Sequence, residues 1–121
     1  MVIVPGMTLQ ATLSTSASTS DPEIHAVFTD WTPDPNRKAV PLVQRSVISD
    51  TTDTIILDAP VNNQARELTY MSVHNLDTVN HTVIVKTDDG TTERRVIRRT
   101  ISVGAALCYE QGHGWYVLPL A

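Results

Sequence analysis

Apolar and polar residues alternate along short stretches of this chain, and turn-forming residues separate the stretches. In residues 23–31, Ile24, Ala26 and Phe28 occupy every second position, as in a strand with one buried face. From Val47 onward, short runs rich in β-branched residues follow one another closely. This pattern is typical of all-β folds, and we predict a small antiparallel β-sandwich of jelly-roll type. The expected strands cover residues 23–31, 52–58, 66–75, 79–87, 91–101, 105–109 and 115–118.

The stretch 91–101 also allows a helix, because its arginines stand at the i,i+4 spacing of a helix face. Like charges at that spacing repel one another, however, and Val96 and Ile97 are β-branched. The preceding Asp89-Gly90 pair is typical of a tight hairpin turn, since the glycine readily adopts a positive φ. We therefore predict a strand here and keep the helix as the alternative.

The first 22 residues differ from the rest of the chain. Residues 8–20 are rich in Ser and Thr and offer few side chains to bury, which is typical of a flexible tether. Val2, Ile3, Val4 and Met7 lie at the outer end of that tether, where a free chain gains nothing from them. We therefore predict an extended N-terminal arm over residues 1–22 whose apolar tip docks on a partner. The sandwich domain would then cover residues 23–121.

Inside the domain, residues 32–46 contain Pro33, Pro35 and Pro41. Proline lacks an N–H and fixes φ, so it interrupts hydrogen-bonded ladders. We expect this stretch to cross the surface as a long connection.

The composition indicates a thin core. Hydrophobic residues make up 41% of the chain but aromatic residues only 5%, so the core must consist of Val, Ile and Leu. If the first fifty or so residues lie outside the core, the remaining ~70 fall in the size range where a core alone rarely supplies more than ~3–5 kcal/mol. We therefore expect self-association, as a homotrimer.

Charge and segment composition exclude several classes of partner. The formal net charge is −4 and neither half of the chain is basic, which argues against nucleic-acid binding. No apolar run approaches the ~20 residues of a membrane span, and Pro5-Gly6 interrupts the first residues before a secretory signal could form. The single cysteine, Cys108, excludes an intrachain disulfide and fits synthesis in a reducing cytoplasm.

The candidates for catalysis or metal binding are few. His74 and His81 flank a predicted turn, but two ligands without a third hold metal poorly, and we favour surface positions for the histidines. Cys108 and His113 flank a glycine-rich turn with no oxyanion-hole motif nearby, so we interpret Cys108 as a small buried residue. We predict no catalytic residue, no metal and no cofactor.

Two groups of residues are candidates for binding. The first is the basic cluster on the strand 91–101, whose arginines we divide between two faces as Arg94 with Arg98 and Arg95 with Arg99. They either protect an ordinary solvated edge strand or pair with the acidic first half of a neighbouring copy. The acidic residues considered for that pairing are Asp21, Glu23, Asp30 and Asp34.

The second group is aromatic. Trp31, Trp115 and Tyr116 lie next to polar turn residues, as do the rings on which sugars stack in carbohydrate-binding proteins. Alternatively Trp115 closes the core, because Val117 and Leu118 continue its strand. We favour the core position for Trp115.

The order of segments resembles small virion structural proteins of tailed bacteriophages. The resemblance rests on IHAVFTD, TTDTIILDAP, VHNLD, DDGTTERR and ISVGAALCYEQGHGW, and extends from about Glu23 to Leu118. It implies a non-enzymatic β-sandwich subunit that is made in the host cytoplasm and carried on the virion. Its partners would be further copies of itself and other virion proteins such as the major capsid protein.

We therefore expect a capsid decoration or cement protein that stabilises the shell through oligomeric and arm-mediated contacts. The alternative is a carbohydrate- or receptor-binding module of the tail or its fibres.

Overall fold

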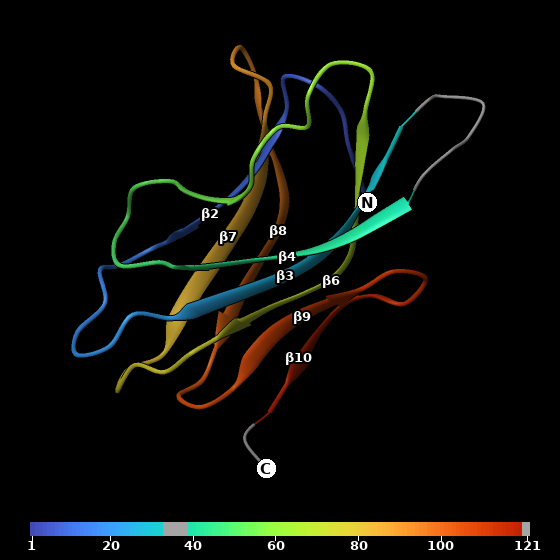
Figure 1. Ribbon diagram of the computed structural model, residues 1–121. Coiled ribbons are helices and arrows are strands. Elements are labelled where there is room, and N and C mark those ends of the chain that lie inside the picture. The colour runs from blue at the N-terminus through green and yellow to red at the C-terminus, as the bar shows by residue number, and fades with distance from the viewer. Residues whose placement is uncertain (33–38, 120–121) are drawn as a thin grey trace.

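The protein is built from two antiparallel β-sheets (Figure 1). The computed structural model describes residues 1–32 and 39–119, with the backbone alone at residues 39 and 40, and the described residues form ten strands and no helix. The larger sheet has the order β10-β9-β6-β3-β4, and β1 also pairs with β6. Its strands are β1 (Val2–Ile3), β3 (Glu23–Trp31), β4 (Ala39–Val47), β6 (Ala65–His74), β9 (Ala106–Glu110) and β10 (Gly114–Leu118).

The smaller sheet has the order β5-β2-β7-β8, and its strands run in a different direction from those of the larger sheet in Figure 1. Its strands are β2 (Thr8–Leu13), β5 (Thr54–Leu57), β7 (His81–Asp88) and β8 (Glu93–Ile101). The predicted all-β sandwich is therefore confirmed. Each of the seven predicted strands has a counterpart, and β8 is a strand and not a helix.

The predicted N-terminal arm is wrong, because residues 1–22 belong to the sandwich. β2 lies between β5 and β7, with Leu9 opposite Thr87 and Leu13 opposite Val83. Leu9, Ala11 and Leu13 are buried, and so is Ile3 of β1. The alternating Leu and Ala residues of TLQATL are enough to form a buried strand once two neighbouring strands satisfy its backbone on both sides.

The predicted connection over residues 32–46 is wrong in its second half, which forms β4. This strand pairs with β3 along its whole length, from Trp31 opposite Ala39 to Glu23 opposite Val47. β4 is an edge strand, and an edge tolerates Pro41 because no second neighbour needs its missing N–H. Pro33 and Pro35 lie outside the described residues.

The core lies between the two sheets and contains aliphatic residues with one methionine, one phenylalanine and one tyrosine. Residues from β1 and β2 share it with residues from β3, β5, β6, β7, β8 and β9, so the core does not begin at residue 23. Its buried members are Ile3, Leu9, Ala11, Leu13, Ile24, Ala26, Phe28, Ile48, Ile56, Leu57, Leu68, Met71, Val73, Val83, Val85, Ile101, Leu107 and Tyr109. The argument for oligomerisation assumed that the first part of the chain lies outside the core, and that assumption is wrong.

Candidate functional site

The face of the larger sheet that points away from the smaller sheet carries exposed apolar side chains. Residues opposite each other in an antiparallel sheet point to the same side, so Val43, Val27 and Tyr70 form one row across β4, β3 and β6. Val43 is 56% exposed and Val47, four residues further along β4 on the same face, is 52% exposed. We call this surface the outer face.

A tyrosine pair covers the only cysteine on the outer face. Cys108 lies opposite Ser72 on one side and Tyr116 on the other, and its thiol contacts the hydroxyl groups of Tyr70 and Tyr116. Burial raises the pKa of Cys108, and burial likewise raises the pKa values of Tyr70 and Tyr116. A protonated, covered thiol is a poor nucleophile. This geometry agrees with the interpretation of Cys108 as a buried residue.

A groove of about 300 Å³ opens beside the outer face, at the end of β3 (Trp31) and the start of β6. Among the described residues it is lined by Val2, Trp31, Ala65 and Glu67. The indole nitrogen of Trp31 donates a hydrogen bond to Oε2 of Glu67 at 3.1 Å, and the side-chain amide of Gln111 donates to Oε1 of Glu67. A ring and a carboxylate thus line one accessible groove, and the amide of Gln111 binds that carboxylate.

The four arginines at 94, 95, 98 and 99 are exposed on β8, which is the edge of the smaller sheet. The β7–β8 ladder contains a bulge: Val85 lies opposite Ile97, whereas Lys86 lies opposite Arg95. The extra residue changes the predicted division of the arginines, because a bulge shifts the following side chains to the other face. Arg95 and Arg98 share the solvent face of the sheet, and Arg94 and Arg99 share the other side.

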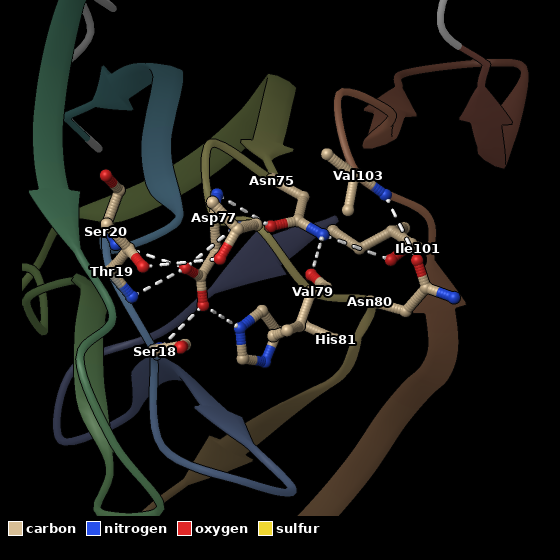
Figure 2. Close-up of polar contacts among 11 residues, drawn as sticks. Ser18, Thr19, Ser20, Asn75, Asp77, Val79, Asn80, His81, Ile101 and Val103 are labelled. Atoms are coloured by element: carbon tan, nitrogen blue, oxygen red, sulfur yellow. Dashed lines mark hydrogen bonds and ion pairs between the residues drawn. The ribbon is translucent and has the colours of Figure 1, made fainter.

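A buried carboxylate joins the β2–β3 loop to the β6–β7 turn at one end of the sandwich (Figure 2). Oδ2 of Asp77 accepts hydrogen bonds from the backbone N–H of Ser18 at 2.7 Å and from Nε2 of His81 at 2.6 Å. Oδ1 of Asp77 accepts from the N–H groups of Thr19, Ser20 and Thr78, at 2.8, 3.1 and 2.8 Å. The side chains of Asp77 and His81 are both fully buried. We call this arrangement the Asp77 clasp.

Asn75 extends the Asp77 clasp to the turn that follows β8. Its side-chain amide donates to the carbonyl groups of Val79 and Ile101, at 3.0 and 3.2 Å, and its side-chain oxygen accepts from the N–H of Asp77 (Figure 2). The β2–β3 loop, the β6–β7 turn and the β8–β9 turn are therefore fixed to one another. The N–H groups around Asp77, first that of Ser18 and then the side chain of His81, hold the pKa of its carboxyl far below the ordinary value.

The Asp77 clasp is structural and not an exposed acid–base pair. Neither side chain reaches solvent, and Nδ1 of His81 is buried without a hydrogen-bond partner. The expectation that the histidines lie at the surface is wrong for His81, although His74 and His113 are exposed. Within residues 1–32 and 39–119, no group of three His, Cys, Asp or Glu side chains could hold a metal ion.

The predicted binding residues separate into different regions. Of the apolar residues near the N-terminus, Ile3 is fully buried and Met7 packs against the core, whereas Val2 and Val4 are exposed. Trp31 and Tyr116 both belong to the outer face, but Trp115 packs on Tyr109 with ring centroids 5.1 Å apart and borders the core. Trp115 therefore packs against the core from its border, which agrees with the position that we favoured.

The acidic residues considered as partners for the arginines are largely engaged or unsuited. Asp30 forms an ion pair with Arg66 at 2.8 Å in its own chain, and Asp34 lies outside the described residues. Asp21 is half-buried, and only Glu23 is exposed. The proposed contact with the acidic first half of a neighbouring copy thus has little support from the positions of these residues.

No family model, curated protein or solved structure matches this chain. The surfaces described above are therefore the basis for any functional proposal. The structure contains no helix long and apolar enough to cross a membrane within its described residues.

The sequence interpretation missed the Asp77 clasp. A usable signal was present, because Asn75, Asp77 and His81 follow directly after a predicted strand, and Asn and Asp side chains commonly bond to nearby backbone N–H groups. The sequence did not reveal the donors from the distant loop, which are the three consecutive backbone N–H groups of residues 18–20.

Proposed function

We propose that the chain is a non-enzymatic structural subunit of a bacteriophage virion, of the kind that decorates or cements the capsid shell. The observation that supports an assembly role is the outer face. It presents Val43 and Val47 to solvent beside Val27 and Tyr70, on a sheet whose opposite side already covers the core. Exposed apolar residues gathered on one face mark surfaces that another protein covers.

The occupant that we propose for the outer face is a second copy of the chain, within a homotrimer. β4 is an edge strand, so copies can approach one another along it and bury both its apolar side chains and its free backbone groups. Contacts through an N-terminal arm are not part of this proposal, since residues 1–22 are built into the fold. Other virion proteins, including the major capsid protein, are the proposed partners of the assembled trimer.

Replacing Val43 by Glu tests the self-association. We expect the unmodified protein to have an oligomeric mass in light scattering at tens of micromolar, and Val43→Glu to be a monomer with an unchanged melting temperature. A charge placed in an apolar contact costs several kcal/mol, whereas on an exposed strand position it costs the fold little.

The matched control is Val61→Glu, because Val61 is 64% exposed but lies in the loop between β5 and β6. This variant should keep the oligomeric mass. A monomeric unmodified protein at the same concentration would contradict the proposed trimer. Mass spectrometry of purified virions, with the chain absent from them, would contradict the virion assignment independently of the oligomeric state.

A second candidate function is carbohydrate binding, as in a tail or fibre module, and the groove at Trp31 favours it. Glu67 and Gln111 could exchange hydrogen bonds with sugar hydroxyl groups while the ring of Trp31 supplies the stacking surface. We expect binding on a glycan array to be lost in Trp31→Ala and Glu67→Gln but retained in Tyr116→Ala. An array on which the unmodified protein binds no glycan would eliminate this candidate.

A further inference from the structure

β8 combines a free sheet edge with an unusual density of positive charge. It pairs with β7 on one side and has no strand on its other side among the described residues. Four arginines fall within residues 94–99, and adjacent strand residues are ~3.3 Å apart, so the backbone that carries all four spans only about 17 Å. The chain as a whole has a formal net charge of −4.

The acidic side chains near β8 are largely paired with other cations and not with these arginines. Lys86 binds Asp53 at 2.8 Å and Glu93 at 3.0 Å, so the acidic residue on β8 is already paired. Arg99 donates to the carbonyl oxygen of Arg98, and Arg94 lies near the carboxylate of Asp89. In the described part of the chain, no carboxylate forms an ion pair with Arg95 or Arg98.

The bulge gives the edge a definite pattern. Arg95 and Arg98 point to the solvent face, and Arg94 and Arg99 to the opposite side, as the pairing with β7 requires. Between the two ends lie Val96 and Ile97, which are partly buried against the core. Each face of the strand therefore has an arginine before and after the short apolar centre.

We propose that the β8 edge binds an extended acidic segment of a partner protein, which adds to the smaller sheet as a further strand. Carboxylates at both ends of the segment would pair with the guanidinium groups, and apolar residues at its centre would lie beside Val96 and Ile97. This inference concerns a different surface from the outer face and does not depend on the proposed trimer.

The free backbone of β8 favours a peptide over other anions. An edge strand offers both N–H and C=O groups, and its carbonyl groups need donors that a phosphate or sulfate chain lacks. Pairing of β8 with β8 of a second copy is disfavoured, because it would bring the two arginine clusters together. An acidic peptide satisfies the charges and both kinds of backbone group at once.

The test uses the full chain and a fluorescent nine-residue peptide with Glu near both ends and Val at the centre. We expect binding by fluorescence anisotropy that weakens about tenfold in the double variant Arg95→Gln/Arg98→Gln. Arg45→Gln is the matched control and should bind as the unmodified protein does. Arg45 is also an exposed arginine on an edge strand, but that strand is β4 of the larger sheet. Circular dichroism would verify that each variant is folded.

Further ligands separate strand addition from simple charge attraction. Two further peptides have the same sequence but carry N-methyl groups on every second backbone nitrogen, one on the odd and one on the even positions. The peptide whose methyl groups face β8 should lose most of its affinity, because it can no longer donate to the free carbonyl groups. If both methylated peptides bound as tightly as the unmethylated one, the proposal would be overturned. Tighter binding of a single-stranded oligonucleotide than of the peptide would also overturn it, and so would peptide binding that is unaffected by Arg95→Gln/Arg98→Gln.

Discussion

Removal of residues 1–22 should abolish the folded state and not merely free the sandwich of a tail. The deletion takes away β2, which lies between β5 and β7, and leaves both neighbours with unpaired backbone groups. It also removes Ile3, Leu9, Ala11 and Leu13 from the core. We expect the truncated protein to show no cooperative thermal transition by circular dichroism.

Two adjacent substitutions sharpen this test without shortening the chain. Ile3 is 0% exposed and Val2 is 56% exposed, although both belong to the same short strand. Ile3→Asp should destabilise the protein by more than about 4 kcal/mol, since it removes a buried side chain and buries an unpaired charge. Val2→Asp should change the stability by less than about 1 kcal/mol. Equal melting temperatures for the two variants would show that β1 does not pack on the core.

The second large effect is expected for Asp77→Asn, which we predict to lower the melting temperature at pH 7 by about 10 °C or more. The amide can accept hydrogen bonds with only one of its two terminal atoms, whereas both oxygens of Asp77 accept them from residues 18–20, Thr78 and His81. The matched control is Asp89→Asn. Asp89 also accepts from backbone N–H groups, but it lies in an exposed turn, and its loss should have a small effect.

The pH dependence of stability provides an independent measurement on the same residue. The pKa of Asp77 is depressed in the folded state, so its contribution is complete above the unfolded-state pKa of about 3.9 and is lost as pH falls below that value. The melting temperature of the unmodified protein should therefore fall steeply from pH 5 to pH 2. Asp77→Asn should fall less steeply over the same range. Parallel curves for the two proteins would show that the carboxylate does not stabilise the fold.

The sequence predicted strands that show either apolar–polar alternation or β-branched residues next to a turn. β3 was predicted with its observed bounds, and β8 was recognised because Val96 and Ile97 are β-branched and a turn precedes them. β2 was missed because its apolar residues are few and its polar residues are Thr and Gln, so its burial depends on β5 and β7 and not on its own composition.

The candidate surfaces were less accessible to sequence reasoning than the strands. The arginine cluster could be read directly, but the bulge that determines which arginines share a face arises from pairing with β7. The outer face could not be predicted either, because β4 contains Pro41 and resembled a connection. The Asp77 clasp joins residues about sixty positions apart, and no local pattern reports such a contact.

The position of β2 also determines when the protein can fold during its synthesis. Thr8 lies opposite Asp88, so the second strand to leave the ribosome must wait for the seventh before it has a complete partner on that side. Contacts between such distant positions slow folding, because long loops must close before the contacts form. Until then Leu9 and Leu13 remain exposed on a nascent chain, where they are natural binding sites for a chaperone and a source of aggregation if synthesis stalls before β7 is complete.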